Sequence, residues 1–182
     1  MAEYQLPYVA HATMETMNCT ADVREDGCSI HVPTQSPLGV RDTAATMLGL
    51  PRDRVLVQPT FAGGGFGRRV GDDFVREAVL ASRHARRPVQ VVYTREDDFA
   101  HDAYRPCSLH RLEARLGDDG LPVAWSHRIV TPSILAQDPD FHDPIDPVAV
   151  EGAKELPYAI ADLQVELVKV PAPFPLGFWR SV

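Results

Sequence analysis

The stretch FAGGGFGRRVGDDF, residues 61–74, decides how this sequence is interpreted. Residues 63–67 are glycine at every position except Phe66, and Arg68 and Arg69 follow directly. Glycine has no Cβ, so a cluster of this kind between a strand and a helix lets the backbone approach another group closely. The stretch therefore predicts a turn from strand to helix that is built around a close contact.

The chemistry of this loop favours an anionic ligand. Loop N–H groups and a following helix N-terminus attract negative charge, and arginine adds permanent charge with forked donors. The spacing does not fit a phosphate-binding P-loop, because Arg68 and Arg69 follow Gly67 where Lys and Ser or Thr are needed. It does not fit the dinucleotide fingerprint either, because Arg68 and Val70 stand where a glycine is required. A tight turn or close helix–strand packing stays open as an alternative, although one or two glycines would serve it.

The segments around the loop predict a compact α+β unit over residues 18–93, in the order β-β-α-β-loop-α-β. Residues 54–58 and 89–93 are expected to be buried strands, and a helix between them begins near Asp72 and Asp73. Its expected apolar face consists of Phe74, Ala78, Ala81 and Ala85. Upstream, the pattern predicts strands over 18–24 and 28–32, then a helix that ends before Gly49 and Pro51.

Residues 94–182 predict a second part that is rich in strands. A polar, acidic connection comes first, and two long strands over 109–115 and 121–131 then flank the turn GDDG. We expect a short helix over 148–154 and a last strand over 163–170.

Composition excludes several classes of protein. The chain has 182 residues, a net charge of −7 and no basic run, which argues against nucleic-acid binding. No apolar stretch approaches the roughly 20 residues of a membrane-spanning helix. The three cysteines show no CxxC spacing, so zinc and iron–sulfur ligation within the chain are not expected. Both ends are apolar, which predicts a piece of a longer polypeptide.

Other candidate groups have plainer interpretations. His11 and Glu15 are four residues apart and could form a metal pair, but a structural hydrogen-bonding role fits their strand-like context better. Residues 95–98 (REDD) could bind a divalent cation or form a solvated loop. Cys19 and Cys28 could face each other across a hairpin, as a disulfide or as ordinary thiols.

Several colinear motifs carry a resemblance to a known family. The chain resembles the large, molybdenum-binding subunit of the xanthine dehydrogenase and aldehyde oxidase family, in the branch of the isoquinoline 1-oxidoreductase beta subunit. The motifs are PYVAHATMETMNCTA (7–21), VPTQSPLGVRDTAATMLGLPRDRVLVQ (32–58), GGGFGRR (63–69), HDAYRP (101–106), ELPYAIADLQVE (155–166) and GFWRSV (177–182). They extend over nearly the whole chain.

The resemblance implies a molybdenum-cofactor-binding-domain-like α+β fold with mixed β-sheets and helices packed on one face. It implies a molybdenum-carrying molybdopterin, usually the cytosine dinucleotide in bacteria. The full subunit would hydroxylate an aldehyde or N-heteroaromatic substrate with water as the oxygen source. Electrons would leave through a separate [2Fe–2S] small subunit, in a bacterial cytoplasm or periplasm that the sequence does not distinguish.

The resemblance also implies roles for particular residues. Backbone groups of the glycine loop would line the cofactor, Arg180 would lie close to cofactor or substrate, and Trp179 would form a wall of the substrate pocket. The cofactor-binding residues implied are Gly64, Gly65, Phe66, Gly67, Arg68 and Arg180.

Departures from the family pattern limit these implications. Val9 stands where xanthine-oxidising relatives carry a glutamine, and Val70 stands where they carry a substrate-contacting glutamate, so a less polar substrate than a purine is expected. The family's catalytic glutamate lies downstream of this chain, so we expect no catalytic residue, no tightly bound cofactor and no turnover in the fragment alone. A non-catalytic cofactor- or protein-binding module that keeps the fold is the alternative.

Overall fold

The computed structural model describes residues 1–179, which form two compact units. The glycine-loop unit consists of Ala10–Ala103 with Phe178 and Trp179. The strand unit consists of Met1–Val9 and Tyr104–Gly177. The sequence interpretation divided the chain near residue 93, whereas the first nine residues join the strand unit and Phe178 returns to the glycine-loop unit.

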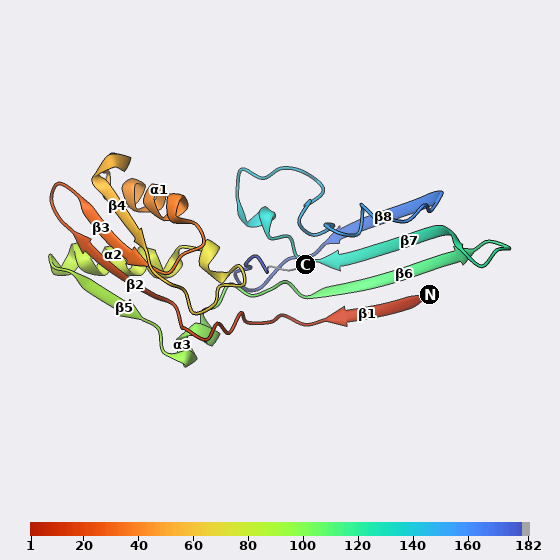
Figure 1. The fold of residues 1–182 in the computed structure, drawn as a ribbon, viewed down its shortest axis with the longest axis horizontal. Helices are drawn as coiled ribbons and strands as arrows, with labels where there is room; N and C mark the ends of the chain where they lie inside the picture. Colours follow the sequence, from red (N-terminus) through yellow and green to blue (C-terminus); the bar gives the residue numbers. More distant parts are fainter. Residues whose placement is uncertain (180–182) are drawn as a thin grey trace. The chain divides into compact units, whose positions relative to one another are not determined.

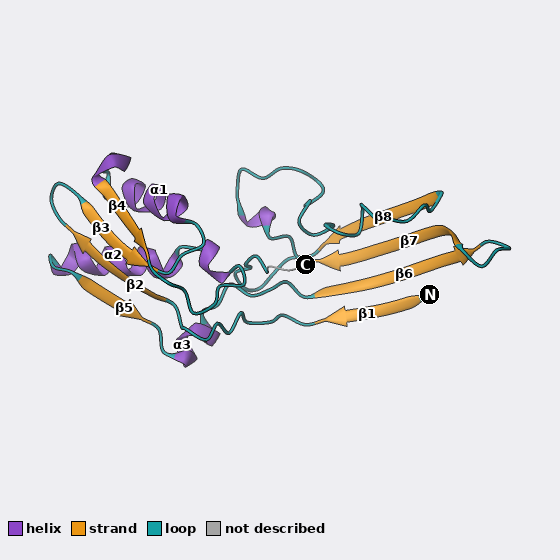
Figure 2. Cartoon of the chain, in the orientation of Figure 1, coloured by secondary structure: helices purple, strands orange, loops and turns teal. Residues whose placement is uncertain are grey.

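The glycine-loop unit is built on a mixed four-stranded sheet in the order β4-β3-β2-β5 (Figures 1 and 2). Its strands are β2 (Asn18–Val23), β3 (Cys28–Val32), β4 (Val55–Pro59) and β5 (Val89–Val92). β2 is antiparallel to both β3 and β5, and β3 is parallel to β4. The parallel pair requires a crossover, which α1 (Pro37–Leu48) supplies.

Two helices bury the core of this unit. Alternate side chains of β2 and β3 face α1 and α2 (Asp73–Ala85). α1 has a proline in its first turn and ends at Gly49, whose left-handed backbone returns its N–H to the carbonyls of Ala45 and Thr46. The fully buried core side chains include Cys19, Ala21, Ile30, Val32, Ala44, Phe74, Val75, Ala78 and Val79. The predicted order of elements is confirmed.

Some details differ from the expected pattern. β4 and β5 are edge strands and half-exposed, not buried, because each pairs on one side only. The buried face of α2 includes Val75 and Val79, while Ala85 is exposed. Residues 95–100 form a short helix, α3 (Arg95–Ala100), which starts with a capping box between Thr94 and Asp97 instead of continuing as a loop.

The strand unit is a second mixed sheet in the order β1-β6-β7-β8. Its strands are β1 (Ala2–Leu6), β6 (Ser108–Leu116), β7 (Pro122–Thr131) and β8 (Asp162–Lys169). Neighbouring strands are antiparallel except β7 and β8, which are parallel. β1 was not predicted, and residues 148–154 form turns, not the expected helix. Ile129, Val150 and Ala153 form a small core here.

Two simpler expectations concern membranes and thiols. No helix within the described part of the chain has the length and apolar character needed to cross a membrane. Cys19 and Cys28 are free and buried, and burial raises the pKa of Cys19 to about 12 and that of Cys28 to about 11. They are ordinary buried thiols.

Candidate functional site

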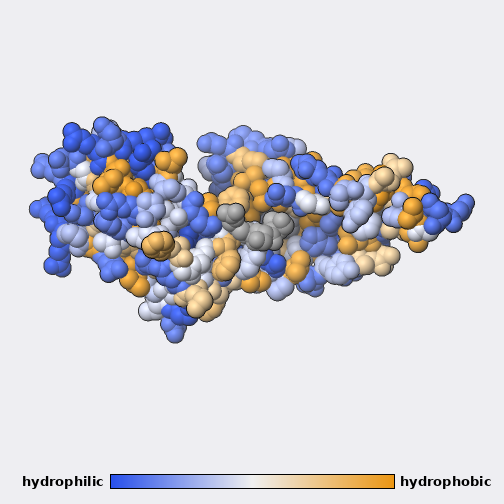
Figure 3. Space-filling model, in the orientation of Figure 1, coloured by the Kyte–Doolittle hydropathy of each residue, from blue (hydrophilic) through white to orange (hydrophobic). Residues whose placement is uncertain are grey.

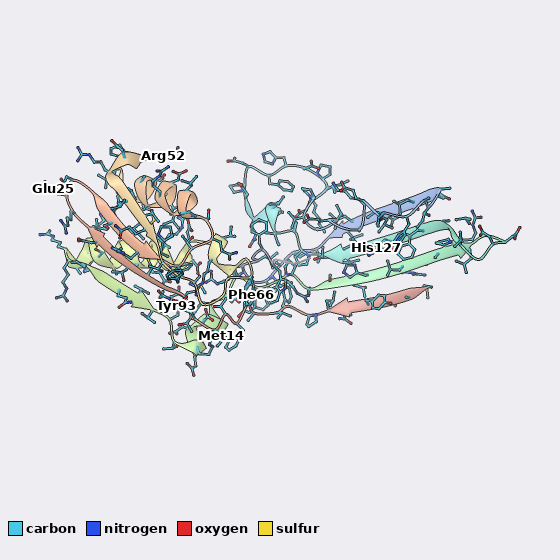
Figure 4. All side chains as sticks on the ribbon, in the orientation of Figure 1. Met14, Glu25, Arg52, Phe66, Tyr93 and His127 are labelled. Atoms are coloured by element: carbon cyan, nitrogen blue, oxygen red, sulfur yellow. The ribbon has the colours of Figure 1, made fainter. Side chains whose placement is uncertain are left out.

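The glycine loop connects β4 to α2 through a short 3-10 turn, η2 (Arg68–Val70). Its backbone is left-handed at Gly64 (φ 99°), Phe66 (φ 54°) and Gly67 (φ 103°). A left-handed conformation is costly for a residue with a Cβ, and Phe66 adopts it while its side chain is 53% exposed. Figure 4 labels Phe66 in this loop. Strained backbone of this kind is often retained at functional sites.

Three of the glycines are required by contacts within the protein. A Cβ on Gly63 would lie 2.5 Å from Cβ of Glu15, and one on Gly65 would lie 2.5 Å from Oε1 of Gln35. A Cβ on Gly67 would overlap the backbone carbonyl of Phe178. The expectation that residues 63–67 are bare only to receive a guest is therefore corrected, because the chain's own segments occupy that space at these three positions.

The loop nevertheless presents free donors. Within residues 1–179, no acceptor pairs with the backbone N–H groups of Gly64, Gly65 and Phe66, whereas the N–H groups on either side are paired. Gly63 N–H donates to Glu15 and Gly67 N–H donates to Gln35. Successive backbone N–H groups in a partly exposed turn form an anion-binding concavity. This arrangement fits an anionic or oxygen-rich group beside Gly64, Gly65 and Phe66.

The structure places Arg68 inside the protein. Its side chain is 1% exposed and forms a bidentate ion pair with Asp73, at 2.7 and 2.6 Å. Its Nε lies 2.8 Å from Oδ1 of Asp102. Burial alone would lower the pKa of Arg68, but the ion pairs with Asp73 and Asp102 outweigh that effect and raise it. The sequence interpretation expected direct contact between Arg68 and an anion, whereas its guanidinium is buried and paired with Asp73 of α2 and with Asp102.

Arg69 fixes the shape of the loop. It is fully buried, and its Nε donates to the carbonyl of Gly64 at 2.7 Å. Its other nitrogens donate to the carbonyls of Pro33 and Glu15 and to the Glu15 carboxylate. Burial lowers the pKa of Arg69 despite the nearby Glu15 carboxylate. Arg69 therefore occupies the Gly64 carbonyl, while the N–H groups of Gly64, Gly65 and Phe66 keep no acceptor within residues 1–179.

A buried histidine connects the loop to the segment at Phe178. His11 Nδ1 lies 3.1 Å from both carboxylate oxygens of Asp102, and its Nε2 lies 2.9 Å from the carbonyl oxygen of Phe178. Both ring nitrogens therefore face oxygen atoms, so the ring is held at both ends. The His11 ring also packs on Trp179, with centroids 4.9 Å apart. Asp102, His11 and Phe178 thus hold Trp179 beside the loop.

The remaining predicted positions have the following places. Arg180 lies outside the described residues. Val70 ends η2 and is 38% exposed. Val9 belongs to the strand unit, where its carbonyl accepts from Arg105 N–H at 3.0 Å.

The alternative metal sites find no support. Glu15 binds Arg69 and not His11. In the REDD segment, Arg95 pairs with Asp98 and Asp97 caps α3. No cluster of three or more His, Cys, Asp or Glu side chains suited to a metal ion occurs among the residues that the structure describes.

A solved structure with the same fold defines the class of domain. Quinoline 2-oxidoreductase from Pseudomonas putida 86 superimposes on 98% of this chain and 23% of its own chain, with a TM-score of 0.74. The sequences are 19% identical, so this likeness establishes the fold alone. The predicted α+β fold of the molybdenum-cofactor-binding type is confirmed.

The family follows from the sequence comparison. The family model of the molybdopterin cofactor-binding domain matches residues 1–170, and the chain belongs to this family. It is 31% identical over 137 residues to isoquinoline 1-oxidoreductase subunit beta from Brevundimonas diminuta, covering 74% of this chain and 18% of that relative. It is 33% identical over 111 residues to a membrane-bound aldehyde dehydrogenase [pyrroloquinoline-quinone] from Gluconacetobacter polyoxogenes, covering 60% of this chain and 14% of that relative. The chain therefore spans less than a fifth of the length of these curated relatives.

The predicted structural hydrogen-bonding role of His11 is confirmed, but sequence reasoning missed how it and other residues organise the loop from a distance. Gln35, His11 and Asp102 each contact it or its neighbours across long sequence separations. Gln35 looks like an ordinary residue before a helix, and no local spacing connects His11 to Asp102.

Proposed function

We propose that this chain supplies one wall of the cofactor site in the large subunit of a molybdenum hydroxylase. The single observation that supports the proposal is the row of unpaired N–H groups at Gly64, Gly65 and Phe66. These donors would hold an oxygen-bearing part of molybdopterin, which we expect in its cytosine dinucleotide form. When bound, the molybdenum centre supplies the redox chemistry and transfers an oxygen that derives from water.

The protein residues have positioning roles in this proposal. Arg69 fixes the carbonyls of the loop, and Gln35 holds the N–H groups of Gly67 and Arg69. Gly67 serves the close approach of Phe178, and its N–H already donates to Gln35. Trp179 would form a wall of the substrate pocket, and Arg180 would provide a positive charge near cofactor or substrate. Arg68 acts through the loop and not by direct contact.

The reaction we propose for the full subunit is the hydroxylation of a small aldehyde or N-heteroaromatic compound. Val70 presents an apolar, partly exposed side chain after the loop, which favours a substrate less polar than a purine. The partner would be a [2Fe–2S] small subunit that removes electrons. The catalytic base would lie elsewhere in the subunit, so the isolated chain would be inactive. A non-catalytic binding module is a second candidate, which the same loop donors would also suit.

The test uses Gly64→Ala in the full-length subunit, with Gly120→Ala as the matched control. Both glycines have positive φ, and neither substitution meets an atom closer than 3.4 Å. The two variants thus share a backbone strain of about 1–2 kcal/mol, but only Gly64 lies among the free donors. We expect molybdenum and nucleotide content to fall sharply in Gly64→Ala and to stay at the wild-type value in Gly120→Ala. Equal molybdenum content in the two variants would show that the glycine loop is not part of the cofactor site.

A further inference from the structure

A second candidate site lies in the glycine-loop unit, away from the loop. A cleft of about 850 Å³ lies between the β2–β3 turn, the residues after α1 and the end of α2. Figure 4 shows Glu25, which lines this cleft, at the opposite end of the unit from Phe66. The volume lies within the range of about 300–1,000 Å³ that small-molecule sites occupy.

The cleft combines an apolar floor with a basic rim. Val23, Leu48 and Leu50 are half-buried and line it together with Pro88. Its rim carries the cationic side chains of Arg24, Arg83, Arg86 and Arg87, which outnumber the two carboxylates of Asp22 and Glu25. Figure 3 shows hydrophilic side chains gathered at this end of the unit. Such a surface complements a ligand with an apolar body and several negative charges.

Two of these arginines have no partner in the described part of the chain. Arg24 pairs with Asp22 at 2.6 Å, and Arg83 donates to the carbonyl of Met47 at 3.3 Å. Arg86 and Arg87 form no ion pair and donate no side-chain hydrogen bond within residues 1–179. Their guanidinium groups are therefore available to phosphate or carboxylate oxygens.

The backbone of Arg86 provides a further indication. It caps α2 in the left-handed conformation, with φ 54° and ψ 38°, a position where glycine is strongly favoured. A positive charge near a helix C-terminus is favourable, but Arg83 and His84 already supply it in the last turn of α2. Capping thus does not explain why a strained position carries an arginine.

We propose that this cleft binds a small organic anion with two or more phosphate groups beside an apolar ring, the chemistry of a nucleoside diphosphate or triphosphate. The phosphates would bind Arg86 and Arg87, with Arg83 beside them. The ring would lie on Leu48 and Leu50. This site shares no residue with the glycine loop, so it stands or falls independently of the proposed function.

The experiment titrates ADP into the 182-residue chain by calorimetry, with inorganic diphosphate and adenosine as separate arms. We expect ADP to bind, diphosphate to bind more weakly and adenosine to show no binding. Added salt should weaken ADP binding, because the contact is largely between charges. No ADP binding at millimolar concentration would overturn the proposal, and equal affinity for ADP and diphosphate would overturn the role of the apolar floor.

The decisive variant is Arg86→Gly. Glycine relieves the left-handed backbone, so the melting temperature should not fall, while ADP affinity should drop by about tenfold or more. Arg87→Gln should have a similar effect on affinity. Arg111→Gln on β6, whose side chain pairs with Glu113, is the control and should leave ADP affinity unchanged. ADP binding that survives Arg86→Gly and Arg87→Gln unchanged would refute the assignment.

Discussion

Replacing Asp102 by Asn tests the buried network that holds the candidate site together. Asp102 is 3% exposed, accepts hydrogen bonds from the backbone N–H of His11 and from His11 Nδ1, and forms an ion pair with Arg68, whose Nε lies 2.8 Å from its Oδ1. Asparagine keeps the shape of the side chain but removes its charge. Its amide NH₂ would also face at least one of these donors, because only one of its two terminal atoms can accept a hydrogen bond.

The expected loss of stability follows from the burial of both partners. Removing one member of a buried ion pair costs about 3–5 kcal/mol, because the remaining charge is left uncompensated. Here Arg68 is the charged partner that would lose Asp102, but it keeps its bidentate pair with Asp73, whose side chain is 47% exposed. We therefore expect a loss near the lower limit, about 3 kcal/mol. That is a large part of the roughly 5–15 kcal/mol by which domains are stable.

The assay is urea unfolding followed by circular dichroism at neutral pH, with Asp42→Asn as the control. Asp42 pairs with Arg52 in the same unit, but their side chains are 41% and 70% exposed. Exposed pairs contribute about 0–1 kcal/mol, so the control should change little. A loss below about 1 kcal/mol in Asp102→Asn, with an unchanged m-value, would refute the argument from burial.

Two further predictions concern other parts of the chain. In urea unfolding, Gly67→Ala should destabilise the protein more than Gly120→Ala. Both positions have positive φ, but only at residue 67 would the added Cβ collide with the Phe178 carbonyl. Equal losses of stability in the two variants would contradict that contact. Desolvation lowers the pKa of His110, and desolvation together with His110 lowers that of His127; their rings are hydrogen-bonded at 2.9 Å. Because the unfolded chain therefore binds more protons than the folded one at low pH, the pair should reduce the stability of the fold there. Stability should be unaffected by the pair above the ordinary histidine pKa of 6.5 and should decline as pH falls through and below it. The measurement is unfolding followed by Trp125 fluorescence at successive pH values. Stability should decline less steeply with falling pH in His127→Gln than in the wild type, and an unchanged slope would exclude the His110–His127 pair as the cause.

Local sequence signals predicted the elements of the fold well, and the limits of those signals explain the errors. The helix over α1 and its end at Gly49 follow from periodicity and a left-handed cap, which are local. The edge positions of β4 and β5 depend on which strands pair in the sheet, which local sequence does not show. β1 is a strand only because it pairs with β6, which is distant in sequence. Five polar or mixed residues at a chain end have no alternation strong enough to predict a strand.

The candidate site was predictable only where its chemistry lies in one stretch of sequence. The glycine cluster identified the loop, but its partners Gln35, Asp102 and Phe178 come from distant segments. Arg68 and Arg69 were expected to attract a ligand because sequence alone does not show burial. The structure gives both guanidinium groups internal acceptors. Their charge therefore acts on the shape of the loop.

Close contacts within the protein explain some features of the glycine loop, and a bound ligand would explain the others. Gly63, Gly65 and Gly67 lack side chains because Glu15, Gln35 and Phe178 occupy the adjacent space. Contacts within the protein do not explain why three successive N–H groups, at Gly64, Gly65 and Phe66, have no acceptor in the described chain, or why Phe66 is held at positive φ. Strained backbone carries a cost unless something else compensates for it, and partly exposed N–H groups without a protein acceptor are open to a ligand or to water. An oxygen-rich ligand at these three residues would accept hydrogen bonds from all three and account for the strain at Phe66.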